Sequence, residues 1–201
     1  IIGNIVRGGS QRGLMYGLLE AAEQVRQRGF LTAVKREPSN ELRGVRWAVR
    51  AVDQDEAWFQ NSELWRGFFQ TLARERINRF NLVFREPLSL MLSGWVRPPG
   101  WSGSALASGV EELRERRLAG VRAIAQMASD YGVEFVLGFW PSEGAGDASY
   151  VRDALPMLVA ACPALHGIQL SGESNGEAAV NVLGQAGRLV RRPARLVRPP
   201  A

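Results

Sequence analysis

The sequence contains very few of the residues that build metal and redox sites. Its 201 residues include one cysteine, Cys162, and one histidine, His166. A single cysteine excludes an internal disulfide and a cysteine-built zinc site. A single histidine excludes His-His metal motifs and leaves little for a histidine-centred triad. We therefore expect neither a metal nor another cofactor.

Long apolar runs and glycine-rich phosphate loops are also missing. No uninterrupted apolar stretch approaches the roughly 18–20 residues needed to cross a bilayer. The sequence has neither G-x-G-x-x-G after a first strand nor G-x-x-x-x-G-K-[ST]. Hydrophobic residues make up 46% and charged residues 22%, as in ordinary globular chains. These features predict a folded protein with no membrane partner and no nucleotide cradle.

The net charge of +5 belongs to the C-terminal end of the chain. Five arginines and no acidic residue lie in 188–201, so residues 1–187 hold twenty basic and twenty acidic groups. A globally basic, nucleic-acid-binding surface is therefore disfavoured. The Arg- and Pro-rich tail, 188–201, has no helical or strand period, and we expect it to be disordered. It is either a phosphate-contacting arm or an extension foreign to the native protein.

Both ends of the chain predict an incomplete protein. The chain begins with Ile1 and carries no recognisable secretory signal. A turn-rich stretch, Pro38-Ser39-Asn40, is the candidate boundary between two parts. We expect residues 1–38 to be the C-terminal part of an N-terminal α/β domain and residues 39–187 the first half of a barrel. The compartment stays open.

Strand and helix patterns alternate along the chain. The helix over 13–28 has apolar residues at the three-to-four spacing of an amphipathic helix, and the helix over 63–78 has a similar stripe that includes Leu64 and Leu72. Strands alternate with further helices, and Pro156 is expected to kink or split the helix that contains it. The remaining predicted elements are strands at 42–52, 81–85, 134–140 and 167–171, and helices at 108–128 and 148–162.

This order predicts an α/β fold with a parallel sheet and right-handed crossovers. A complete (β/α)8 barrel needs roughly 250 residues, so four strands in this length make about half of one. We therefore expect a partial (β/α)8 TIM barrel of about four βα units, preceded by the end of a small α/β domain. An open doubly wound sheet fits the same pattern.

Reacting groups in such folds follow the C-terminal ends of strands. The residues expected there offer carboxylates, guanidinium groups and an indole face, which are the groups that carbohydrate sites use. Trp140 also suits core packing, Arg46 a buried charge with a partner, and Glu86 and Glu143 solvated loops. His166 precedes the fourth strand, away from this edge. The candidate set is Arg46, Arg50, Arg85, Glu86, Trp140, Glu143, Glu173 and Asn175.

Several stretches resemble a known enzyme group. The segment from Arg12 to Arg26 resembles the last helix of the small α/β domain that precedes the barrel in family 67 alpha-glucuronidases and family 20 beta-hexosaminidases. Later segments resemble bacterial glycoside-hydrolase-like proteins of the alpha-glucuronidase type. They are Arg43-GVRW, residues 57–84, Glu134-FVLGFW, and residues 150–175, which end in Gly-Glu-Ser-Asn. The likeness covers about residues 10–177.

The resemblance implies a carbohydrate-active barrel that hydrolyses glycosidic bonds. It aligns Glu173 with a family glutamate that is a candidate general acid, while Arg46, Arg85, Trp140 and Asn175 would bind an oligosaccharide or glycoside substrate.

An alternative is a non-catalytic carbohydrate-binding or degenerate barrel relative. It is favoured by Ser171, where the family tends to have histidine, and by the altered loop after Trp140. A half-barrel also exposes strand edges, which predicts self-association.

Overall fold

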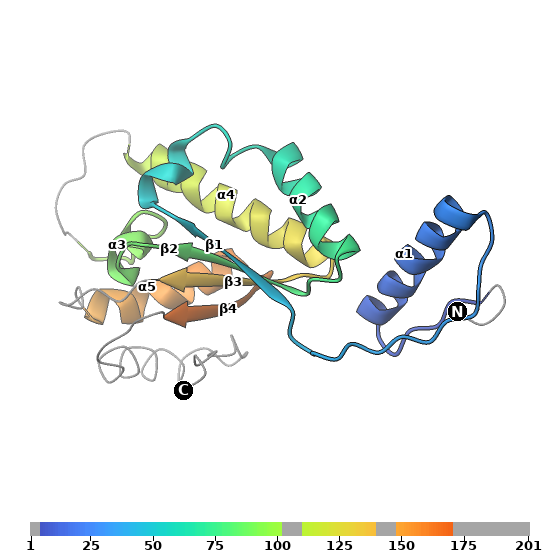
Figure 1. Ribbon diagram of the computed structural model, residues 1–201. Helices are drawn as coiled ribbons and strands as arrows, with labels where there is room; N and C mark the ends of the chain where they lie inside the picture. The colour runs from blue at the N-terminus through green and yellow to red at the C-terminus, as the bar shows by residue number, and fades with distance from the viewer. Residues whose placement is uncertain (1–4, 102–109, 140–147, 171–201) are drawn as a thin grey trace.

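The computed structural model describes residues 5–101, 110–139 and 148–170. Its centre is a parallel sheet of four strands in the order β1-β2-β3-β4. The strands are β1 (Gly44–Val49), β2 (Arg79–Phe84), β3 (Glu134–Phe139) and β4 (Leu165–Leu170). Helices α2 (Ser62–Arg74), α4 (Val110–Asp130) and α5 (Ala148–Ala161) connect them. The predicted α/β fold, as in the first half of a (β/α)8 barrel, is confirmed (Figure 1).

The core lies between one face of the sheet and the helices. Phe80, Leu82 and Phe84 of β2 alternate toward the helices and are fully buried. Trp65 and Phe69 of α2 pack on this layer, with ring centroids 5.9 and 5.7 Å from Phe80. Because β2 is a central strand, burial of these large side chains holds the sheet against its helices and fixes the register of the strands.

The opposite face of the sheet, which we call the inner face, carries the alternate residues of each strand. On β1 these residues, such as Arg46, are exposed, while Val83 and Gly138 are buried where β2 and β3 meet. A Cβ atom on Gly138 would lie 2.7 Å from Cγ2 of Val83. The inner face is therefore open at the β1 side and closely packed at β2 and β3.

Helix α1 (Gln11–Arg28) lies beyond the N-terminal ends of the strands (Figure 1). The Ser10 side chain accepts a hydrogen bond from the Gly13 amide, and Gly29 ends the helix in the left-handed conformation with φ 79°. The helix is joined to the sheet by Arg12, which donates to Glu134, and to the end of α2 by an ion pair between Glu20 and Arg76. It is therefore attached to the body mainly through charged groups.

The apolar stripe of α1 differs from its sequence expectation. Leu14, Leu18 and Val25 are 40%, 53% and 49% exposed, although their spacing is that of a buried face. The opposite side of the helix, with Tyr16 under the Arg43 guanidinium, faces the body instead. Periodicity identified the apolar face of the helix but not the side on which the body lies.

Other element boundaries also differ from the predictions. β1 ends at Val49, because the main chain then enters a short 3-10 helix, Ala51–Asp55, capped by Asp53. α5 runs continuously through Pro156 and is not split. A short helix, α3 (Leu88–Ser93), was not predicted; it buries Met91 and Leu92 in a stretch too brief to show a period.

The predicted stripe of α2 is confirmed in part. Leu72, Trp65 and Phe69 are buried, whereas Leu64 is 37% exposed. The boundary at residue 38, which would divide an N-terminal domain from the barrel, stays a prediction. Among the described residues, no helix combines the length and apolarity that a membrane span requires.

Candidate functional site

The C-terminal edge of the sheet is formed, in the described residues, by the segments that follow β1 and β2. These two segments are tied together at a buried hydrogen bond, in which the indole nitrogen of Trp95 donates to Oε1 of Gln54 at 2.5 Å. Gln54 is 1% exposed and also donates to the Ala51 carbonyl at 3.1 Å. The edge therefore has a rigid base under the polar groups that it presents.

Arg85 and Glu86 follow β2 directly at this edge. Arg85 is exposed, and its main-chain amide donates to the Val49 carbonyl at 3.0 Å, which continues the pairing of β2 with β1. Its guanidinium forms no ion pair or hydrogen bond with the described residues. Glu86 is partly buried, and its Oε2 is a buried oxygen without a hydrogen-bond partner. The edge therefore presents an exposed guanidinium, unpaired among the described residues, and, beside it, a carboxylate with one oxygen shielded from solvent.

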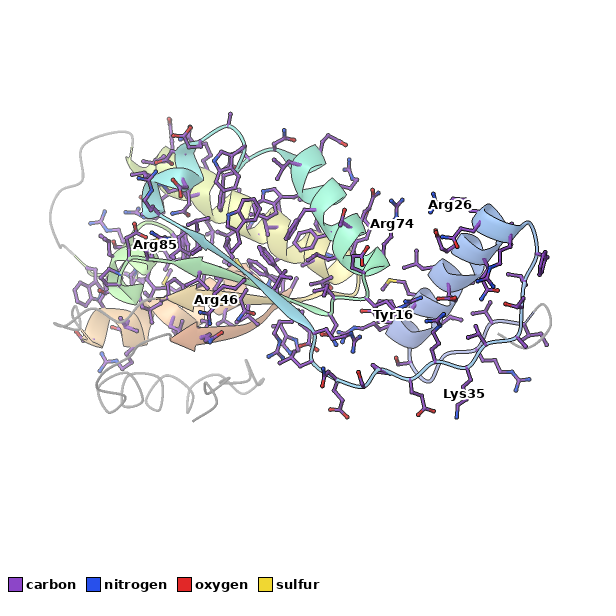
Figure 2. The ribbon with its side chains drawn as sticks, in the orientation of Figure 1. Tyr16, Arg26, Lys35, Arg46, Arg74 and Arg85 are labelled. Atoms are coloured by element: carbon purple, nitrogen blue, oxygen red, sulfur yellow. The ribbon has the colours of Figure 1, made fainter. Side chains whose placement is uncertain are left out.

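Arg46 lies lower in the sheet than its sequence expectation suggests. It is in the middle of β1, on the inner face, in register with Asn81 of β2. Asn81 precedes Arg85 by four residues, so the two arginines are separated by about 13 Å along the strand direction. The Arg46 side chain is exposed and unpaired within the described ranges. Figure 2 shows Arg46 over the sheet and Arg85 nearer the arrowheads of the strands.

The guanidinium of Arg50 already has a carboxylate partner. Its Nη2 donates to Oδ1 of Asp53 at 3.1 Å, and its amide donates to Oδ2 at 2.8 Å. Further along this segment, Asp55 binds Arg117, whose Nε lies 2.9 Å from Oδ1. Hydrogen bonding from Arg117 is the main cause that lowers the pKa of Asp55. These acidic residues are therefore committed to structural pairs.

The remaining sequence candidates lie outside the described residues. They are Trp140 and Glu143, which follow β3, and Glu173 and Asn175, which follow β4. Of the five residues with a predicted role in catalysis or substrate binding, the structure describes Arg46 and Arg85.

Sequence reasoning missed an amide pair on the inner face. Nδ2 of Asn81 donates to Oε1 of Gln169 at 2.7 Å, and Gln169 is 7% exposed. The Oδ1 atom of Asn81 is buried and has no partner. The signal was present as a polar residue between apolar neighbours in a strand, which marks the face opposite the core.

Sequence reasoning also missed an aromatic pair between the segment after β2 and helix α5. Trp101 and Tyr150 meet edge to face, with centroids 4.8 Å apart and planes at 89°. Tyr150 donates its hydroxyl to the Val96 carbonyl at 2.6 Å, and burial raises its pKa. A tryptophan in a loop rich in glycine and proline was the available signal.

A charged cluster lies at the opposite, N-terminal edge of the sheet. Nη2 of Arg79 is 2.7 Å from Oε2 of Glu134, and Nη2 of Arg12 is 3.4 Å from Oε1. Nε2 of His166 is 3.4 Å from Oε2. Burial raises the pKa of Glu134, but the hydrogen bond from Arg79 and the nearby positive charges outweigh it and leave the pKa lowered. This cluster joins α1 to the sheet, away from the candidate site.

Neither a metal site nor a reactive thiol is found in the described ranges. No group of three or more His, Cys, Asp or Glu side chains is arranged there to hold a metal ion. Cys162 is buried, and burial raises its pKa to about 11, so it is a neutral thiol in the core at physiological pH. The described residues of the candidate edge offer guanidinium, carboxylate, amide and aromatic groups.

Comparisons with known proteins identify the fold. No protein-family model and no curated protein matches the chain. The solved structure of a GH138 enzyme targeting pectin rhamnogalacturonan II matches with a TM-score of 0.67 at 16% sequence identity. The match covers 81% of this chain and 22% of that protein, so the chain spans about a fifth of its length. The likeness shows a fold shared with part of a glycoside hydrolase.

Proposed function

We propose that this chain is part of a carbohydrate-active protein of the glycoside-hydrolase type, and that it binds an anionic oligosaccharide across the inner face and the C-terminal edge of its sheet. The observation that carries the proposal is the pair Arg46 and Arg85. Both have exposed guanidinium groups without a partner in the described residues, on a fold shared with part of a GH138 enzyme.

The contrast with neighbouring arginines supports this role. The guanidinium groups of Arg50 and Arg117 donate hydrogen bonds to Asp53 and Asp55, respectively. Arg85 directly follows β2 at the C-terminal edge and has no such carboxylate among the described residues. A planar guanidinium binds a carboxylate through two parallel hydrogen bonds, so a uronic acid is the sugar that fits it best.

In the complete protein, the proposal assigns the chemistry to carboxylates after the strands. Glu173 would protonate the glycosidic oxygen as general acid, and Asn175 and Trp140 would contact the sugar. Glycoside hydrolysis generally uses a second carboxylate about 5–10 Å from the first. Glu86, with its unpartnered Oε2, is a described carboxylate at this edge. More specifically, the proposed activity is that of an alpha-glucuronidase or a hexosaminidase.

Binding should be measured first, by calorimetry with oligogalacturonate as the probe. Arg85→Gln and Arg46→Gln should each weaken binding about tenfold or more, since hydrogen bonds between charged groups are lost. Arg74→Gln, which changes an exposed arginine in the last turn of α2, is the matched control and should bind normally. Equal affinity of all three variants and the unmodified chain would contradict the proposed site.

Catalysis is tested separately, with aryl glucuronides and aryl N-acetylhexosaminides as substrates of the complete protein. Glu173→Gln should abolish turnover while leaving oligogalacturonate binding in place. Binding without any hydrolysis would favour the alternative, a non-catalytic carbohydrate-binding relative. Unchanged turnover in Glu173→Gln would remove this residue from the mechanism.

We also propose that the chain self-associates through the edges of its sheet. β1 and β4 are the outer strands of the described sheet, and an unpaired edge is a template for pairing with another strand. Sedimentation of the 201-residue chain should give a mass that rises with concentration. A monomer mass at every concentration would contradict this part of the proposal.

A further inference from the structure

Chain connectivity puts the Trp101–Tyr150 pair at the C-terminal edge of the sheet, the edge at which Arg85 lies. Trp101 belongs to the segment that leaves β2 at its C-terminal end. Tyr150 is in the first turn of α5, and a helix that follows a parallel strand begins near the C-terminal edge of the sheet. The contact between α3 and α5 brings these two segments together. The pair is therefore at the rim of the proposed sugar site.

Trp101 is held in place from several directions. Arg97 donates twice to its main-chain carbonyl, from Nε at 3.1 Å and from Nη2 at 2.9 Å. The Tyr150 ring meets the indole edge to face, and the Tyr150 hydroxyl is fixed by the Val96 carbonyl. Asp153 has a lowered pKa, chiefly because Arg152 hydrogen-bonds to it, and a hydrogen bond from the Trp101 side chain contributes. The indole thus has little freedom to lose on binding.

The environment of Trp101 differs from that of the core tryptophans. Trp65 and Trp95 are each 1% exposed. Trp101 is partly exposed, and within the described residues Tyr150 is its one aromatic neighbour. A rigid, partly exposed indole with a polar surround has the features of a recognition residue.

We propose that Trp101 is a sugar-stacking platform at the rim of the C-terminal edge, where its indole packs against the apolar C–H face of a pyranose ring. The inference rests on the proposed function, which supplies the oligosaccharide, and adds a binding residue for a sugar unit next to the one held by Arg85. Because the indole is fixed before binding, stacking costs little side-chain entropy. Tyr150 acts as a positioning residue, since its ring sets the orientation of the indole.

The test compares oligogalacturonate binding at low and high salt. Trp101→Ala should weaken binding about tenfold, a typical loss for an aromatic anchor, and the loss should be the same at both salt concentrations because stacking is not a charge interaction. Trp101→Phe should retain part of the affinity. The loss in Arg85→Gln should shrink at high salt because salt screens the exposed guanidinium. This difference separates the platform from the arginine site.

Two variants of Tyr150 and one control variant distinguish a role in stacking from a role in loop structure. Tyr150→Phe keeps the ring and should bind nearly normally, whereas Tyr150→Leu removes the ring and should weaken binding without unfolding the chain. Phe30→Ala removes a 60% exposed aromatic residue far from the rim and should change nothing. Normal binding by folded Trp101→Ala, with Arg85→Gln impaired, overturns the platform and leaves the proposed function standing. If the unmodified chain binds no oligogalacturonate, the proposed function fails and the platform falls with it.

Discussion

Asn81 and Gln169 are 88 residues apart in the sequence and joined by one hydrogen bond, from Nδ2 to Oε1 at 2.7 Å, across the inner face of the sheet. They belong to β2 and β4, which are separated by β3. The bond therefore spans three strands and orients the Asn81 amide. In that orientation the Oδ1 atom of Asn81 is left buried and without a partner.

The contributions of Asn81 and Gln169 to the free energy of unfolding should be coupled. Asn81→Leu leaves the buried amide of Gln169 unpaired and should destabilise the fold by about 1–3 kcal/mol. Gln169→Leu should have a similar cost for the same reason. The double variant removes both polar groups and should recover much of the loss, as measured by urea unfolding of all four proteins. Additive losses in the double variant would show that the two side chains act independently.

The contact between Gly138 and Val83 makes a second prediction. A Cβ on Gly138 would lie 2.7 Å from Cγ2 of Val83, so Gly138→Ala should destabilise the sheet by about 1–3 kcal/mol through overpacking. Pairing it with Val83→Ala makes room and should restore part of the stability. The control is Gly67→Ala in α2, where a new Cβ meets nothing within 4 Å. That change should stabilise the helix by about 0.5–1 kcal/mol, and thermal unfolding measures all three.

The helices and strands around the sheet could be predicted from the spacing of hydrophobic residues, because the residues at those positions are the ones that pack in the core. β3 is apolar after Glu134 and buried on both faces, and the apolar stripe of α2 faces β2. The period was misleading for α1, whose body-facing side is charged and aromatic. It could not reveal α3, which has six residues.

The site was harder to predict than the fold. Strand order placed Arg85 at the C-terminal edge, whereas Arg46 lies in the middle of β1, which ends at Val49 before the turn made by Asp53. Trp101 is fixed by Arg97, four residues before it, and by Tyr150 of α5, which no sequence period brings to it. The contact with Tyr150 forms only when the tertiary fold brings the two segments together.

The Glu134 cluster predicts how stability changes in acid. Burial raises the pKa of Glu134, but the Arg79 hydrogen bond and nearby charges leave it below the ordinary value of 4.5 in the folded chain. The unfolded chain therefore binds a proton more readily, so the stability contributed by Glu134 is present above about pH 4.5 and lost as pH falls through the lowered folded value.

Glu134→Gln should accordingly reduce the slope of stability against pH in this acid range, measured by urea unfolding at a series of pH values. Glu75→Gln, at an exposed position at the end of α2, is the matched control and should keep the slope of the unmodified chain. Equal slopes in Glu134→Gln and the unmodified chain would mean that Arg79 and Arg12 do not lower the pKa of Glu134 in the folded chain.

The last prediction concerns the exposed face of α1. If Leu18 is about half exposed, as the structure has it, Leu18→Glu should change the free energy of unfolding by no more than about 0.5 kcal/mol. Leu72→Ala, at a 6% exposed position in α2, should cost about 2–5 kcal/mol under the same conditions. Urea unfolding at low protein concentration separates the two cases. A loss for Leu18→Glu as large as that for Leu72→Ala would show that the stripe is covered in solution, because a charge is costly only where water is excluded.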